Sequence, residues 1–186
     1  MNIFIKFILT VLVLAIILGL AYWVYNFYYT AKNPAPISNA DLSSQKALTK
    51  VDAQNATYTI NGQAFKLTNG KAENLMIFGE PFFGDLNGDG AQDAALMLVY
   101  NPSGSGTFYY IASAIKDTAN NLIIGSNAIL LGDRIAPQNI AIDSAGKITV
   151  NYADRQKNEP LSTPPSIGVS RYFFVDGSTL VENSGK

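Results

Sequence analysis

The sequence predicts an all-β fold, a single sandwich or barrel-like domain of short antiparallel strands that follows one N-terminal transmembrane helix. Two observations predict the β domain: short apolar runs alternate with turn residues from Ala56 onward, and no later segment carries a helical apolar stripe longer than three turns. A third, the uncharged run Phe7–Tyr29, predicts the helix. The length of 186 residues leaves room for one domain beyond this run.

The N-terminal run is long enough to be a membrane anchor. As a helix rising about 1.5 Å per residue, Phe7–Tyr29 would span about 30–35 Å, the thickness of a bilayer's hydrocarbon core. It is longer than the apolar region of a cleavable signal peptide and ends in aromatic residues typical of the membrane interface. We therefore predict a single-pass signal anchor at residues 1–30, with Lys6 favouring a cytoplasmic N-terminus; a cleaved signal peptide is the alternative.

Residues 31–48 are predicted to be a linker, because they are rich in Pro, Asn, Ser and Ala and lack periodicity. Residues 49–186 form the predicted extracytoplasmic β domain, with at most one short helix near Leu42–Val51. The dipeptides Asn61-Gly62 and Asp176-Gly177 predict hairpin turns. The run Ala94–Tyr100 is apolar on both faces, which is typical of a central strand.

The first predicted hairpin pairs the runs "ATYTI" and "QAFKL". The further strand candidates are Leu75–Phe78, Ala94–Tyr100, Thr107–Ile115, Leu122–Ile124, Ala128–Leu131, Asn139–Ile142, Lys147–Tyr152, Ser170–Val175 and Thr179–Glu182. The Pro-rich stretch Asn158–Gly168 lies between the candidates Lys147–Tyr152 and Ser170–Val175. It predicts a loop, since proline is excluded from interior strands.

Composition excludes several classes of function. Eleven of the thirteen Lys and Arg residues and all fourteen acidic residues follow Lys32, and no basic stripe is present, which argues against a nucleic-acid partner. Cysteine and histidine are absent, which removes the usual zinc ligands, thiol nucleophiles and the histidine base of most hydrolytic triads. We predict no catalytic residues from the sequence.

The stretch "GDLNGDGAQDAAL", residues 84–96, concentrates acidic residues in an otherwise weakly charged chain. Numbering from Asp85, oxygen-bearing side chains stand at positions one, three, five and nine, with glycine at six and a backbone carbonyl at seven. This spacing is typical of a calcium loop, because Ca²⁺ takes six to eight hard oxygen ligands. The predicted metal ligands are Asp85, Asn87, Asp89, Ala91 through its carbonyl, and Asp93.

Two departures bear on this prediction. Position twelve is Leu96 in place of the bidentate Glu of an EF-hand, so we expect weak binding, with a dissociation constant of about 10⁻⁴ to 10⁻³ M, as in extracellular modules. Asp, Asn and Gly are also ordinary turn formers, and a turn without metal is the alternative interpretation. If Ca²⁺ binds, we expect a structural role.

The loop resembles the Asp-x-Asn-x-Asp-Gly-x-x-Asp motifs of dockerins and of FG-GAP and integrin-type propeller blades. It is closer to the FG-GAP arrangement, since Phe78-Gly79 precedes the loop and a hydrophobic strand follows it. The resemblance covers about a dozen residues and implies the same ligands. A single loop without an internal repeat excludes a propeller. The wider pattern "GDLNGDGAQDAA…GSGTFYY…LLGDRIAP" is similar to membrane-anchored bacterial proteins, which implies a location and no activity.

These observations lead to one functional expectation and one alternative. We expect a membrane-anchored β domain outside the cytoplasm, stabilised by one Ca²⁺ and acting as a binding or envelope-structural module, with an envelope protein or glycan as partner. The alternative is a membrane-tethered hydrolase that acts on carbohydrate through paired carboxylates. The Asp-Arg pairs at 133–134 and 154–155, and the aromatic pairs at 109–110 and 173–174, are weaker candidates for a site.

Overall fold

The computed structural model describes the backbone of residues 3–32 and 47–183 and the side-chain environments of residues 12–28 and 47–183. Residues 33–46, most of the predicted linker, lie outside the described residues, as does the first part of the predicted helix near Leu42–Val51. The chain divides into two compact units, residues 1–45 and 46–186. Each unit is considered separately below.

The first unit contains one helix, α1 (Ile3–Lys32). It covers the whole apolar run, and within it Trp23 stacks on Phe27 with ring centroids 5.8 Å apart. Across the described parts of the chain, no helix proves both long enough and apolar enough to span a bilayer. The membrane anchor therefore stays a prediction from the sequence.

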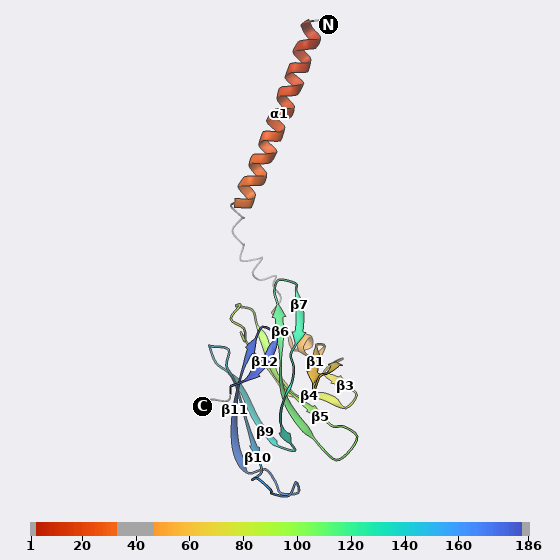
Figure 1. Cartoon of the computed structure of the whole chain (residues 1–186), viewed down its shortest axis with the longest axis vertical. Helices are drawn as coiled ribbons and strands as arrows, with labels where there is room; N and C mark the ends of the chain where they lie inside the picture. Colours follow the sequence, from red (N-terminus) through yellow and green to blue (C-terminus); the bar gives the residue numbers. More distant parts are fainter. Residues whose placement is uncertain (1–2, 33–46, 184–186) are drawn as a thin grey trace. The chain divides into compact units, whose positions relative to one another are not determined.

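The second unit is mostly antiparallel β structure, as predicted (Figure 1). It begins with the short helix α3 (Lys50–Gln54), in which the side chain of Thr49 accepts the backbone N–H of Asp52 and Asp52 bonds back to Thr49. This reciprocal capping box stabilises a helix of five residues. The strands are β1 (Thr57–Ile60), β2 (Gln63–Lys66), β3 (Lys71–Ala72), β4 (Leu75–Gly84), β5 (Asp93–Tyr100), β6 (Phe108–Asp117), β7 (Leu122–Gly125), β8 (Ile129–Asp133), β9 (Ala136–Ile142), β10 (Ile148–Asp154), β11 (Ile167–Asp176) and β12 (Thr179–Glu182).

These strands form three sheets. The six-stranded sheet has the order β3-β4-β5-β6-β7, with β8 also pairing with β6. The four-stranded sheet has the order β12-β11-β10-β9, and β1 pairs with β2 in a separate hairpin. Both predicted hairpin turns are confirmed: Asn61 and Gly62 join β1 to β2 with positive φ, and Gly177 turns β11 into β12 with φ +60°.

The six-stranded sheet is buried on both faces, because β5 sends alternate side chains to two different cores. Leu96 and Leu98 pack with Tyr58 and Leu67 in the core under β1, β2 and α3. Met97, from the opposite face of β5, packs with residues of the four-stranded sheet in a second core. The second core also contains Ile111, Ile148, Val150, Phe173 and Leu180. The prediction that Ala94–Tyr100 is a central strand is confirmed.

Several sequence predictions differ from the structure in extent, among them the start of β9 at Ala136 where the sequence predicts Asn139. The strand predicted to end at Phe78 continues to Gly84, because a bulge between Phe78 and Phe82 accommodates Gly79–Pro81 without ending the pairing with β5. The helix predicted near Leu42–Val51 is observed at Lys50–Gln54. The Pro-rich loop ends earlier than predicted, since β11 already begins at Ile167.

Candidate functional site

The acidic loop connects β4 to β5, two central strands of the six-stranded sheet. It leaves β4 after Gly84 and enters β5 at Asp93. Gly88 and Gly90 have φ values of +79° and +81°, a region in which glycine has no steric penalty. Gly90, the glycine at position six of the predicted calcium loop, therefore has a conformation that favours glycine.

Side chains of the loop accept hydrogen bonds from its own backbone. Asp85 accepts the N–H of Gly88 at 2.7 Å through Oδ1 and the N–H of Gly90 at 2.9 Å through Oδ2. Asn87 accepts the N–H of Asp89 at 3.0 Å, and Asp89 accepts the N–H of Ala91 at 2.7 Å. These bonds are typical of Asx turns, and they give each of the three side chains a role in closing the loop.

Asp93 differs from the other loop carboxylates because it is fully buried. Its Oδ2 accepts the N–H of Leu86 at 3.0 Å, and its Oδ1 accepts the N–H of Lys116 in β6 at 2.8 Å. Burial raises the pKa of Asp93, while these two hydrogen bonds oppose the rise. The negative charges of Asp89 and Asp85 raise this pKa further. Asp93 therefore fastens the loop to β6.

The side-chain oxygens of the loop are of the kind that binds a hard cation such as Ca²⁺, although they are not gathered around one point. Within residues 12–28 and 47–183, no three acidic side chains are grouped so as to hold a metal ion. Asp85, Asn87 and Asp89 direct side-chain oxygens at loop N–H groups, and Asp93 lies below them in the core. A carboxylate or amide oxygen that accepts one N–H keeps a second lone pair, so these bonds leave capacity for ligation.

A cavity of about 290 Å³ lies beside the loop, between Asp89 and the end of β6. It is lined by two carboxylates, Asp89 and Asp117, and by Lys116, a buried residue whose Nζ donates to Oδ1 of Asn121 at 2.5 Å. Hydrogen bonds from Asn120 lower the pKa of Asp117. A glycosidase general acid needs a raised pKa, so Asp117 does not fit that role in the hydrolase alternative.

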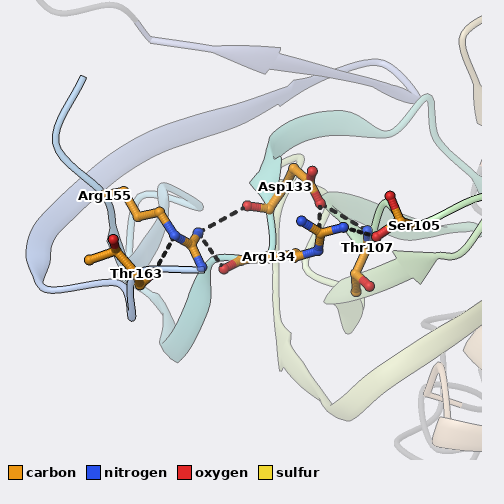
Figure 2. Close-up of polar contacts among 6 residues, drawn as sticks. All are labelled: Ser105, Thr107, Asp133, Arg134, Arg155 and Thr163. Atoms are coloured by element: carbon orange, nitrogen blue, oxygen red, sulfur yellow. Dashed lines mark hydrogen bonds and ion pairs between the residues drawn. The ribbon is translucent and has the colours of Figure 1, made fainter. Parts of the chain in front are cut away.

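Arg134 and Arg155, the weaker candidates from the sequence, connect loops (Figure 2). Arg155 donates to the carbonyl oxygens of Thr163 at 2.5 Å, Arg134 at 2.9 Å and Asp133 at 3.5 Å. Arg134 in turn donates to the carbonyl of Ser105, and Asp133 accepts the N–H of Thr107 at 2.8 Å. Through these hydrogen bonds, the two guanidinium groups connect three loops: the loop before β6, the loop after β8 and the loop after β10.

The aromatic candidates divide between faces of their strands. Tyr110 and Phe173 are buried in the two cores, and their neighbours Tyr109 and Phe174 are half-buried on the opposite faces. They do not form one groove. The aromatic residues that line a surface cavity are instead Phe78 and Phe82 of β4. The sequence singles out Phe78 only as part of the Phe78-Gly79 pair before the acidic loop, and it does not single out Phe82. The only sequence signal for them was the Gly-Glu-Pro insertion between the two rings, which is typical of a bulge.

Comparison of the chain with models of protein families, with curated proteins and with solved structures finds no match. The resemblance to calcium loops consequently rests on the motif itself.

Proposed function

We propose that this chain is a membrane-anchored binding or envelope-structural module, displayed outside the cytoplasm, whose Asp85–Asp93 loop is stabilised by Ca²⁺. The observation that carries the proposal is the acidic loop itself: it joins two central strands and is tied to β6 through Asp93. A cation held there would fix the register of the strands on which both cores depend. In this role the ion stabilises the fold and takes no part in catalysis.

The location is supported by the sequence of the first unit. Phe7–Tyr29 carries no charge and ends in interfacial aromatic residues, and Lys6 stands on its N-terminal side. Oxygen-only cation sites with few strong ligands bind Ca²⁺ weakly, and only an extracytoplasmic compartment supplies the ion at the roughly millimolar level that such sites need. The proposed location and the proposed metal therefore support each other.

Ligation would use the side-chain oxygens of Asp85, Asn87, Asp89 and Asp93 and the carbonyl of Ala91. Bound Ca²⁺ supplies a compact double positive charge that offsets the repulsion among the three carboxylates. This repulsion is one of the causes that raise the pKa of Asp93. The exposed Asp89 and the buried Asp93 would then be held by one ion.

The topology is tested with single cysteines, because the natural chain contains none and gives no background. Ala145→Cys places a thiol on an exposed turn of the β domain, and Asn2→Cys marks the other side of the anchor. A membrane-impermeant maleimide should label Ala145→Cys in intact cells and Asn2→Cys only after lysis. The reverse pattern, or labelling of neither protein before lysis, would contradict display outside the cytoplasm.

The metal is tested by thermal and chemical unfolding of the detergent-solubilised full chain. With a dissociation constant of about 10⁻⁴ to 10⁻³ M, about 10 mM Ca²⁺ should stabilise the domain by about 1.4–2.7 kcal/mol relative to chelator. Asp89→Ala should abolish this difference. The matched control is Asp143→Ala, because Asp143 accepts the N–H groups of Ala145 and Lys147 in another turn and should keep the Ca²⁺ effect when replaced. Unfolding that is identical with calcium and with chelator would refute the metal site.

A further inference from the structure

A second cavity, of about 170 Å³, lies between the bulge of β4 and the edge strand β9. Its apolar walls come from Phe78 and Phe82 on one side and from Met97 and Ile140 beneath, and Gln138 and Asn139 supply polar groups at the rim. The cavity shares no lining residue with the Arg155 contacts or with the cavity beside the acidic loop. It is a separate candidate for a ligand site.

The two phenylalanines present ring surface to solvent. Phe78 is 43% exposed and Phe82 is 41% exposed. Phe78 also packs edge-to-face against Tyr109 with a centroid distance of 5.3 Å, which fixes the ring at the mouth of the cavity. In the bulge between Phe78 and Phe82, the three residues Gly79–Pro81 lie opposite the single residue Leu96, and both rings line the same cavity.

The polar rim is oriented by a ladder of side chains across the outer face of the four-stranded sheet. Ser170 donates to Oδ1 of Asn151, and Nδ2 of Asn151 donates to Oδ1 of Asn139, each at 2.6 Å. Because Oδ1 of Asn139 is an acceptor in this ladder, its Nδ2 group is left to donate. Within the described residues, no protein acceptor is found for that group. Hydrogen-bond chains polarise their members, so the ladder strengthens Asn139 as a donor to a ligand.

The cavity is electrically neutral. Of the described residues that line it, only Glu80 carries a charge, and Nζ of Lys50 lies 2.7 Å from its carboxylate. A charged ligand would therefore find no unpaired residue of opposite charge among the described residues that line the cavity. The chemistry favours a neutral ligand that offers an apolar ring face and hydrogen-bond acceptors.

Both edges of the cavity discourage an added peptide strand. Pro81 interrupts the outer edge of β4, and Pro137 lies in β9, where the pairing with β10 is also bulged. Proline lacks the N–H that an added strand would need, and bulges twist an edge away from pairing. An extended peptide is therefore a poorer fit than a ring-shaped ligand.

We propose that this cavity binds one pyranose ring of a neutral glycan, with the ring packed on Phe78 and Phe82 and a hydroxyl or carbonyl oxygen accepting from Nδ2 of Asn139. The volume is below the range of about 300–1,000 Å³ typical of drug-sized ligands, so a single ring enters and the rest of the polymer lies outside. This inference deepens the proposed binding role and rests on display outside the cytoplasm, where an envelope glycan is within reach. It does not depend on Ca²⁺.

The test is ligand-observed NMR and calorimetry on the detergent-solubilised full chain with two neutral probes, cellotetraose and the β-1,4-linked tetramer of N-acetylglucosamine. At least one should bind with a dissociation constant of about 1 mM or tighter. Phe82→Ala should weaken it by about tenfold, the loss expected for one aromatic contact. The matched control is Phe83→Ala, because Phe83 is the neighbouring ring, is 37% exposed and does not line the cavity.

Asn139→Ala provides a second variant on an exposed edge position, so the test survives if Phe82→Ala fails to fold. It should weaken binding several-fold while unfolding like the natural chain. The glycan site would be overturned if neither tetrasaccharide binds, or if the Phe82→Ala and Asn139→Ala proteins bind as tightly as the natural chain. It would also be overturned if the chain binds a proline-free extended peptide in preference to both tetrasaccharides. If the glycan site is overturned and Ala145→Cys is labelled in intact cells, the proposed location still stands. If Ala145→Cys is labelled only after lysis, the proposed function is refuted as well.

Discussion

Oδ1 of Asp93 accepts a 2.8 Å hydrogen bond from the backbone N–H of Lys116, 23 residues further along the chain. The other carboxylate oxygen accepts the N–H of Leu86 at 3.0 Å, so one fully buried side chain satisfies backbone donors in two segments. The acidic loop, β5 and β6 consequently meet at a single carboxylate. Whatever the loop binds, Asp93 is required to close it.

Replacement of Asp93 should be the most damaging change in the loop. Asp93→Ala leaves the N–H groups of Leu86 and Lys116 buried without acceptors, at about 1–3 kcal/mol each, so we expect a loss of about 2–6 kcal/mol in the free energy of unfolding. Urea denaturation in the presence of chelator measures the loss without any metal contribution. Asp89→Ala is the control, because its single exposed bond to Ala91 should be worth less than about 1 kcal/mol. Equal losses for the two variants would contradict the role of Asp93.

The sequence identified the loop correctly but not the division of roles within it. The spacing of Asp, Asn and Gly predicts a tight turn, and the turn is present because the side-chain bonds involved are local, within five residues. The bond from Asp93 to Lys116 depends on the pairing of β5 with β6, which no local pattern encodes. The one available hint was an aspartate at the start of the otherwise apolar strand "DAALMLVY".

The same contrast applies to the fold. Hairpins and the central strand were predictable, because positive-φ dipeptides and two-sided apolar runs report on local geometry. The layering was not, since the assignment of Leu96 and Met97 to different cores requires knowledge of which sheets cover each face. The cavity at Phe78 and Phe82 was not predicted because the strand was predicted to end at Phe78, whereas a bulge carries the pairing with β5 past Pro81 to Gly84.

Glu182 and Arg171 should make stability depend on acid pH. Arg171 donates from Nε at 2.7 Å and from Nη2 at 2.6 Å to the two carboxylate oxygens, and these bonds hold the pKa of Glu182 below its ordinary value of 4.5. Because the pKa is lower in the folded state, the stabilisation is complete above about pH 4.5 and is lost as the pH falls through the folded-state value.

Glu182→Gln measures this contribution. We expect the variant to be less stable than the natural chain by about 0.5–1 kcal/mol at neutral pH, a range set by the partial exposure of the pair. The difference should shrink toward zero as the pH falls below 4.5 and through the lowered folded-state pKa of Glu182. Urea unfolding of both proteins across this range provides the comparison, and a difference that stays constant with pH would show that the ion pair does not titrate as described.

Arg155 should be needed for order in the loop between β10 and β11. Its planar guanidinium donates to the carbonyls of Thr163 and Arg134 at once, a geometry that the single ammonium of lysine cannot reproduce. Arg155→Lys should lower the free energy of unfolding by about 1–2 kcal/mol and accelerate proteolytic cleavage within residues 156–166. Lys157→Ala, an exposed change in the same loop, is the control for charge and position. Unchanged cleavage in Arg155→Lys would mean that the loop is ordered by other contacts.

Gly125 should tolerate no side chain, because β1 crosses directly over it. A Cβ built at Gly125 would lie 2.3 Å from the carbonyl oxygen of Thr57 and 3.0 Å from Cδ1 of Tyr58. The contact is held by hydrogen bonds from the N–H of Thr59 to the carbonyl of Ser126 and from the N–H of Ala128 to the carbonyl of Thr59, at 3.1 and 2.7 Å, so a shift of β1 would break them.

Gly125→Ala should therefore cost at least about 1–3 kcal/mol, the range for overpacking in a core, and should loosen the β1–β2 hairpin from the six-stranded sheet. Gly168→Ala is the matched control, since Gly168 is also a strand glycine and a Cβ there would meet no atom within 4 Å. It should change the free energy of unfolding by less than about 0.5 kcal/mol. The amides of Thr59 and Ala128 should exchange hydrogen faster in Gly125→Ala and at an unchanged rate in Gly168→Ala. If both amides stay protected in Gly125→Ala, β1 has shifted as a unit, and its contact with Gly125 is not what excludes a side chain there.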